Sequence, residues 1–540
     1  MIGWLVILFG AVVAWLGRRS VARALIRWRL GPYRFPVNRV ELSAPLRLEQ
    51  PRKVAVIGGG LAGIAAASTL GARGYAVTLF EAQSYLGGKL GSWPVELSPG
   101  KHEWVSHGYH AFFRHYYNLN RFLDSLGARQ KFKAISDYRI LLPGGGEFSF
   151  GELENTPVLN LLSLARQGVY RLGEVMAAPT RDLMGVFLEY DPVATFAQLD
   201  GMSYAEFDRR AQLPARLKMA FNTFARAFFA DEEKLSMAEL VKGFHTYYLG
   251  HDGGLVYDHP VQDYEASLLA PIRARLAESG VEVRLSTPVV RLGKPTPRPS
   301  PPRGEGERCH VNGEEFSRVV LAADVVGTRA VLESAEGLEG IDPRLLKLRP
   351  GQRYAVLRLW LDLSARTTLP VFVITDRHRL LDAITFCDRT EAESAAWVRR
   401  NGGSVVELHC YAVPDDLAEE EVRTVLVAEL SKFLPELEKA RVLHDHFQLR
   451  RDFPASHVGM NEQRPGTDTG IDGLFCAGDW VKLPFPAMLM EAAFSSGLVA
   501  ANKILAGDGL REEPIESVPL RGLLAGIPQS PGRKRLMRAG

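Results

Sequence analysis

Three glycines and one glutamate mark the stretch of this sequence that is best suited to chemistry. Gly58, Gly60 and Gly63 follow the apolar run 54–57, and Glu81 follows a second apolar run. In a strand–turn–helix–strand unit, such glycines permit a tight turn, a close backbone approach to phosphate, and close helix–strand packing. The helix start offers free N–H groups and a positive dipole end to phosphates. The pattern indicates a dinucleotide site, with Glu81 accepting hydrogen bonds from ribose hydroxyls, and its alternative is a purely structural glycine turn.

A second glycine turn and a distant glycine–aspartate pair extend this site. Gly87, Gly88 and Lys89 follow Glu81 closely. A glycine pair with a cation beside the first turn suits a flavin dinucleotide more than a nicotinamide one, and its alternative is a surface turn. Far along the chain, an apolar run ends in Gly478 and Asp479, and Asp479 is expected to bond ribityl or ribose hydroxyls. The residues assigned to the cofactor are Gly58, Gly60, Leu61, Ala62, Gly63, Glu81, Ala82, Gly87, Gly88, Lys89, Val289, Gly478, Asp479, Met490 and Ala492.

Two histidines lie among aromatic residues shortly after these turns. His107 and His110 belong to the segment 104–114, in which no third metal ligand stands out. We interpret the segment as a wall of the cofactor pocket and predict no metal site. The four cysteines are scattered and form no Cys-x-x-Cys pair, which excludes a zinc or iron–sulfur motif and favours a reducing compartment.

The elements that must position these residues follow from length and apolar pattern. A chain of 540 residues is too long for one simple core. Residues 281–285, 288–292 and 319–324 are expected as strands that return to the first sheet, and 355–361 and 404–411 as strands of a second sheet. Aromatic residues recur at helical spacing between 221 and 248, which predicts a helical core and also suits an apolar channel. The proline-rich stretch 293–307 is expected to be an exposed loop.

The two ends of the chain suggest contact with a membrane. Residues 1–17 are nearly all apolar, at the short limit for a spanning helix, and arginines follow them. The positive-inside bias places the N-terminus outside and the main body in the cytoplasm. Arg19, Arg23 and Arg27 would share one helix face, and Val21, Leu25 and Trp28 another. For the apolar segment, the alternatives are a cleaved signal peptide and a segment that only dips into the bilayer. For the basic helix, the alternative is a solvated helix packed on the domain. The basic residues Arg533 to Arg538 are either a second membrane contact or a disordered end.

The net charge of +3 does not suggest nucleic acid as a partner.

Together, these motifs resemble the flavin amine-oxidase and carotenoid-desaturase superfamily. Within it, the sequence is more similar to plant-type and cyanobacterial-type carotene desaturases and to isorenieratene-synthase-like desaturase/methyltransferases. The segments 107–113, 224–229, 381–385 and 403–409 carry this closer resemblance. The sequence departs from the family where Lys89 stands in place of a common arginine, which keeps the charge but loses the planar fork. The proline-rich stretch and the N-terminal apolar segment are not general family features.

The resemblance implies an α/β fold: a Rossmann-like FAD-binding domain of the amine-oxidase type, an inserted mixed α+β substrate domain and an N-terminal apolar helix. FAD is the implied cofactor, held by three separate parts of the chain. The expected divisions are 1–30 for a membrane anchor and basic amphipathic helix; 50–150, 265–345 and 441–510 for the FAD-binding domain; 151–264 and 346–440 for the substrate domain; and 511–540 for a basic tail.

The resemblance also implies hydride removal from a carotenoid or related isoprenoid polyene to flavin N5, with a methyl shift in a ring-aromatising branch. His107, His110 and Glu491 are the candidates for a proton acceptor. We further expect contact with membrane lipid, a membrane quinone as the electron acceptor, and a location on the cytoplasmic face of the cell membrane. A flavin amine oxidase and a non-catalytic flavin-binding membrane scaffold are the alternatives.

Overall fold

The computed structural model describes residues 17–135, 137, 139–144, 146–149, 154–168, 170–177, 180–253, 255–293 and 308–527. The predicted apolar segment up to residue 16, the proline-rich stretch from 294 to 307, and the basic residues 533–538 therefore lie outside the described residues. Within the described ranges, no helix is both long enough and apolar enough to cross a membrane.

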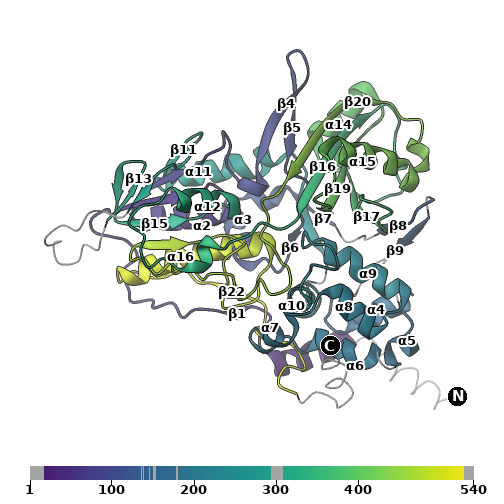
Figure 1. Ribbon diagram of the computed structural model, residues 1–540, viewed down its shortest axis with the longest axis horizontal. Helices are drawn as coiled ribbons and strands as arrows, with labels where there is room; N and C mark the ends of the chain where they lie inside the picture. Colours follow the sequence, from purple (N-terminus) through teal and green to yellow (C-terminus); the bar gives the residue numbers. More distant parts are fainter. Residues whose placement is uncertain are drawn as a thin grey trace.

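A five-stranded parallel sheet forms the first layer of the molecule, on the left of Figure 1. Its order is β11 (Glu282–Arg284), β3 (Ala76–Phe80), β2 (Lys53–Ile57), β15 (Arg318–Leu321) and β21 (Leu474–Cys476). The strands are apolar on both faces because helices α2 (Leu61–Ala72), α11 (Ala270–Glu278) and α16 (Leu489–Gly507) cover one face. The small sheet β12 (Leu292–Gly293), β13 (Cys309–Val311) and β14 (Glu314–Phe316), with α12 (Val325–Glu333), covers the other.

The predicted strand over 288–292 is wrong in this layer. Only Leu292 and Gly293 are extended and paired, with β13. Residues 288–291 form no regular element, and Asn312 holds them by accepting hydrogen bonds from the backbone N–H groups of Val290 and Arg291. This irregular course brings Val289 to the lining of the large cavity described below.

A seven-stranded mixed sheet forms the second layer, at the upper right of Figure 1. Its order is β20 (Val442–Arg450), β16 (Arg353–Leu361), β19 (Ser404–Val413), β18 (Ala383–Phe386), β17 (Phe372–Thr375), β8 (Arg139–Leu141) and β9 (Glu147–Ser149). Helices α14 (Ala392–Asn401) and α15 (Glu419–Phe433) flank it. The expected FAD-binding range 441–510 includes β20, and the expected FAD-binding range 50–150 includes β8 and β9. All three strands pair in this second sheet instead.

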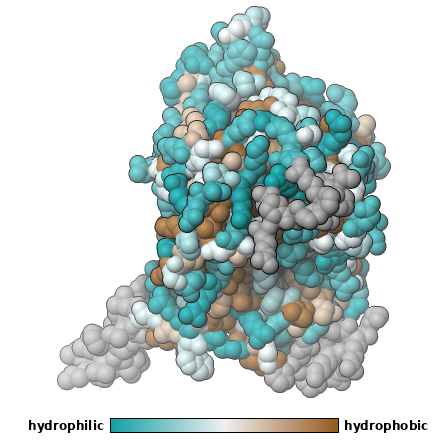
Figure 2. Space-filling model, turned by 90° about the vertical axis from the view of Figure 1, so that its left-hand side faces the viewer, coloured by the Kyte–Doolittle hydropathy of each residue, from teal (hydrophilic) through white to brown (hydrophobic). Residues whose placement is uncertain are grey.

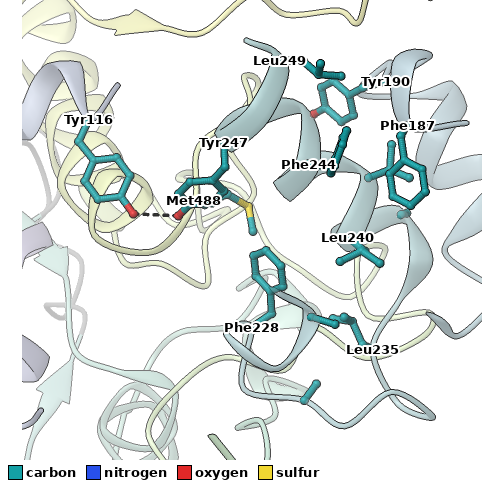
Figure 3. Packing of buried hydrophobic residues seen from close by; sticks show 14 of the residues in the cluster. Tyr116, Phe187, Tyr190, Phe228, Leu235, Leu240, Phe244, Tyr247, Leu249 and Met488 are labelled. Atoms are coloured by element: carbon teal, nitrogen blue, oxygen red, sulfur yellow. Dashed lines mark hydrogen bonds between the residues drawn. The ribbon is translucent and has the colours of Figure 1, made fainter. Parts of the chain in front are cut away.

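Short helices fill the remaining side of the molecule. They are α4 (Leu159–Arg166), α5 (Leu172–Met176), α6 (Thr180–Met184), α7 (Ala194–Leu199), α8 (Tyr204–Ala211), α9 (Ala215–Arg226) and α10 (Met237–Phe244). Their core is aromatic: Phe187, Phe244 and Tyr247 pack in the interior, as Figure 3 shows. A strand also lies within the stretch 151–264, because β10 (Tyr257–Pro260) pairs with β6 (Phe112–Phe113) and β7 (Phe132–Ile135).

The helix over 17–30 packs on the rest of the chain through Ile26, which is buried, and through ion pairs made by its predicted basic face. Arg19 pairs with Glu154 at 2.9 Å and Arg23 with Asp252 at 3.4 Å, so two of the three arginines on this face already have carboxylate partners. The apolar face is the exposed one: Val21 is 60%, Leu25 60% and Trp28 84% exposed. The face of the molecule in Figure 2 is, by contrast, mostly hydrophilic with scattered apolar residues.

Candidate functional site

The two glycine turns pack against each other at the carboxyl ends of the parallel strands. The Gly87 N–H donates to the Gly59 carbonyl at 2.8 Å, and a Cβ on Gly88 would lie 3.0 Å from the Gly60 Cα. Gly58 has a φ of +109°, and a Cβ there would lie 2.7 Å from the Ala322 carbonyl oxygen. The turns therefore need glycine for steric reasons, as the first motif predicts.

The start of helix α2 opens into a large cavity. Its N-cap is Gly60, which offers no side chain to the first N–H groups, and both Leu61 and Ala62 line the cavity. A Cβ on Gly60 would meet only the Gly88 Cα, at 3.9 Å, so the space above the turn is open. Unsatisfied N–H groups and the positive end of a 12-residue helix thus face a space that suits an anionic group.

Lys89 and Asp479 join the two ends of the chain inside this cavity. Their side chains meet at 2.5 Å, and the Lys89 ammonium also lies 4.3 Å from the centre of the Phe453 ring. Burial alone would lower the pKa of Lys89, but the carboxylates of Asp479 and Asp452 raise it above its usual value. Lys89 is therefore a half-buried cation that stays charged, on the second glycine turn beside the helix start, and it can complement a phosphate.

Glu81 stands at the end of β3, next to the first glycine turn. Its carboxylate accepts hydrogen bonds from the backbone N–H groups of Gly59 and Gln83, each at 2.7 Å. Burial raises the pKa of Glu81, and the backbone hydrogen bonds partly oppose that shift. Because Glu81 also lines the cavity, its remaining acceptor positions can bind hydroxyl groups of a ligand.

The cavity has a volume of about 1030 Å³ and extends far beyond the glycine turns. From there it passes between the second sheet and the helices, along Tyr109, Tyr257 and Phe228, and reaches Leu162 and Met176, which are exposed at the surface. Its walls beyond the turns are mainly aromatic and aliphatic. The channel that the aromatic spacing suggested is thus present, and helices α4, α5 and α9 contribute to it.

His107 and His110 both line this cavity. The His107 Nδ1 lies 3.1 Å from the Tyr354 hydroxyl, and the His110 Nδ1 lies 2.8 Å from the Gly108 carbonyl oxygen. Because a carbonyl oxygen only accepts, His110 carries its proton on Nδ1, which leaves a lone pair on Nε2. Burial lowers the pKa of His110 to about 4, so its imidazole is neutral at pH 7.

Three assigned residues do not line the cavity. Gly63 packs α2 onto the strand, because a Cβ there would lie 1.9 Å from the Gly58 carbonyl oxygen. Ala492 is buried within α16. Glu491 points to another helix: its carboxylate accepts hydrogen bonds from the N–H groups of Asn118 and Leu119, at the start of α3 (Tyr117–Ser125). The structure places all other assigned cofactor residues at the cavity wall.

Several cavity residues were not expected from the sequence. Arg450 ends β20, Asp452 and Phe453 follow it, and all three line the cavity, where Lys89 contacts Asp452 and Phe453. Asp382 and Tyr411 reach it from the second sheet. The charged and aromatic residues at the end of β20 were the available signal for the first group, but no spacing relates them to the glycine turns.

The residues at the glycine turns fit a dinucleotide. The uncapped helix start and Lys89 suit its phosphates, and Glu81 suits ribose hydroxyls. Among the described residues, no group of three or more His, Cys, Asp or Glu side chains is arranged to hold a metal ion.

Replacing Glu491 by glutamine should change how stability depends on pH. Burial raises the pKa of Glu491 from 4.5 to about 7, so the folded protein keeps a proton that the unfolded chain has lost. The wild type should therefore lose stability relative to Glu491→Gln as pH rises from about 4.5 to about 7, by about 3 kcal/mol. Urea unfolding across this range measures the difference, and parallel stability curves for the two proteins would contradict it.

The chain was compared with known proteins. A family described as flavin containing amine oxidoreductase matches residues 61–505. A carotenoid phi-ring synthase of Streptomyces griseus is 36% identical over 477 residues, which cover 87% of this chain and 90% of that protein. A protein of the same name from Chlorobaculum tepidum is 28% identical over 600 residues, covering 89% and 92%.

Solved structures share the fold at low sequence identity. Putrescine oxidase matches with a TM-score of 0.60 and 16% identity, covering 85% of this chain and 99% of that one. An oxidoreductase from Methanosarcina mazei matches with a TM-score of 0.56 and 15% identity, covering 83% and 99%. With the match over 61–505 and a site that fits FAD, the chain belongs to the flavin containing amine oxidoreductase family.

Proposed function

We propose that this enzyme desaturates a carotenoid or a related isoprenoid polyene. The two relatives named carotenoid phi-ring synthase cover most of the chain and support a carotenoid substrate. Their names favour the branch of the reaction in which an end ring is aromatised with a methyl shift. When bound, FAD supplies the acceptor for the hydride that leaves the substrate.

The shape of the cavity is the observation that carries this proposal. A space of about 1030 Å³ leads from the glycine turns to exposed apolar residues at the surface. Phe224, Phe228 and Tyr248 line it, with edge-to-face contacts between neighbouring rings. Such a wall binds an extended hydrocarbon by apolar burial and excludes water from it. A small polar substrate would not need this length of apolar wall.

His110 is the residue best placed to accept the substrate proton. Its Nε2 lone pair belongs to a cavity-lining side chain whose Nδ1 is occupied by the Gly108 carbonyl. A pKa of about 4 makes it a weak base. A weak base suffices, because a C–H bond beside an allylic cation is strongly acidic.

Two of the carboxylates that line the cavity are not free to bind an amine substrate. An amine would enter as a cation and would need a free carboxylate or an aromatic cage. Asp479 is paired with Lys89, and Asp382 with Arg377. The carboxylates of these two cavity residues are therefore already neutralised by cations of the chain itself.

Attachment to a membrane surface is part of the proposal. Val21, Leu25 and Trp28 expose one apolar face of the helix over 17–30. Arg19 of this helix pairs with Glu154, whose backbone N–H in turn donates to Ser163 of α4. Since α4 lines the cavity near its surface end, the exposed face and the entrance lie on linked elements. A lipid-dissolved polyene could then enter without crossing water, and a membrane quinone could serve as oxidant on the cytoplasmic side.

Anaerobic addition of a carotene in detergent should bleach the flavin absorbance of the FAD-loaded protein. Ala220→Trp should weaken this reaction about tenfold, because an indole in the cavity wall costs about 1–3 kcal/mol of substrate binding. Dithionite should reduce both proteins equally. Ala215→Trp is the matched control, on the exposed side of the same helix.

No bleaching with lycopene, β-carotene, phytoene or a squalene-type compound would reject the proposed substrate class. Peroxide release with simple amines would favour the amine oxidase. If no product-forming substrate reduces the flavin, the remaining alternative is the non-catalytic flavin-binding membrane scaffold.

His110→Leu should slow flavin reduction by the polyene by about a hundredfold, since a positioned base contributes about that much. The rate constant of the wild type should be flat at neutral pH and should fall as pH drops through about 4, where Nε2 becomes protonated. Stopped-flow absorbance measures both effects. His102→Leu, on an exposed residue of β5 (Lys101–Ser106), is the control. Equal rates for His110→Leu and the wild type would assign the proton to another acceptor.

Trp28→Ser should reduce co-sedimentation with phosphatidylcholine vesicles severalfold, because the exposed indole would lose its place in the interface. Leu42→Ser, which also removes an exposed apolar side chain but lies outside this helix, should have little effect. If both variants sediment like the wild type, the helix over 17–30 is not a membrane contact.

A further inference from the structure

A second pocket, of about 750 Å³, lies beside the helix over 17–30. It is separate from the large cavity and has no role in the proposed reaction. Its lining includes Arg27, Arg34 and Arg114, together with Tyr33, His115 and Asp252. The helix, the chain that follows it, and the segments around 114 and 252 therefore meet at one place.

The pocket carries an excess of positive charge. Its carboxylate, Asp252, already pairs with Arg23 at 3.4 Å. Arg27 and Arg34 lie over the rings of Tyr33 and Tyr117, at 5.9 and 4.9 Å from the ring centres. Neither these two arginines nor Arg114 pairs with a carboxylate anywhere in the described part of the chain. Ring contacts hold the guanidinium groups of Arg27 and Arg34 in place without neutralising them.

Two buried polar groups at the pocket also lack partners. The Tyr33 hydroxyl and both ring nitrogens of His115 have no hydrogen-bond partner among the described residues. Burial raises the pKa of Tyr33 to about 12, so its hydroxyl remains a donor. Burial lowers the pKa of His115, which leaves a neutral ring with one N–H. A ligand rich in acceptors would relieve the cost of these unpaired donors.

We propose that this pocket binds a phosphate-type oxyanion, and that its source is the phosphodiester of an anionic lipid headgroup. Three guanidinium groups supply the planar donors that match phosphate oxygens. The lipid source follows from Arg27, which lies on the same helix as exposed Leu25 and Trp28. Only this choice of source rests on the proposed membrane attachment, whereas the oxyanion site does not.

The test compares the FAD-loaded wild type with the triple variant Arg27→Gln/Arg34→Gln/Arg114→Gln. Arg399→Gln, an exposed arginine on α14, is the matched control. Binding is measured by sedimentation with phosphatidylcholine vesicles and with vesicles of equal parts phosphatidylcholine and phosphatidylglycerol. Isothermal titration with inorganic phosphate forms the second arm. The flavin spectrum and thermal midpoint of each variant report on folding.

The wild type should bind the anionic vesicles more tightly than the neutral ones. The triple variant should lose that excess, at about fivefold per arginine, while its binding to neutral vesicles stays unchanged. Trp28→Ser should instead weaken both kinds of binding, which separates failure of the membrane attachment from failure of the anion site.

Equal binding of anionic vesicles and of inorganic phosphate by the wild type and the triple variant would overturn the proposal. A phosphate signal that disappears in the triple variant, without any change in vesicle binding, would overturn the lipid source. If the triple variant fails to fold, competition settles the question on the wild type alone: inorganic phosphate should release it from anionic vesicles more than chloride of equal ionic strength, and equal release would count against the pocket.

Discussion

The close approach of helix α2 to its neighbours is the constraint on which the rest of the structure depends. Gly63 lets α2 touch the backbone of the first turn, and Gly497 lets α16 cross α2 with its backbone in contact: an added Cβ would lie 2.1 Å from the Ala62 carbonyl oxygen. A side chain at Gly63 would push α2 away from the first turn, and a side chain at Gly497 would push α16 away from α2. The start of α2 would then move away from the sheet edge, and its free N–H groups would no longer face the cavity.

This packing also explains why distant parts of the chain meet at one site. Helix α16 brings Met490 to the cavity, and the turn before it brings Asp479 to Lys89. The hydroxyl of Ser496, on α16, accepts a hydrogen bond from the Gly478 N–H at 2.7 Å, which fixes that turn to the helix. The aromatic helices then only need to cover the remaining side of the cavity to provide an apolar chamber.

The local motifs were predictable from the sequence because their reasons are local. A glycine that must avoid a neighbouring carbonyl, or a strand buried on both faces, leaves a pattern within a few residues. The second sheet was less predictable: β8 and β20 pair with strands far away in the sequence, and nothing in their own residues indicates which strand is the partner. Glu491 shows the same limit at the site. Its position one residue from Met490 suggested the cavity, but the rotation of α16 turns its side chain toward the start of α3.

The order of strands in the parallel sheet has a consequence for synthesis of the chain. β15 lies between β2 and β21, so this interior strand joins the sheet only once residues 318–321 are made, and the edge strand β21 only once residues 474–476 are made. Helix α16, which covers α2, follows β21 in the chain. The apolar surface of α2 that α16 covers therefore stays exposed during synthesis of the preceding segments, and the cofactor chamber can close only after α16 has emerged. Until then the growing chain exposes the apolar surface of α2, which is the kind of surface that chaperones shield.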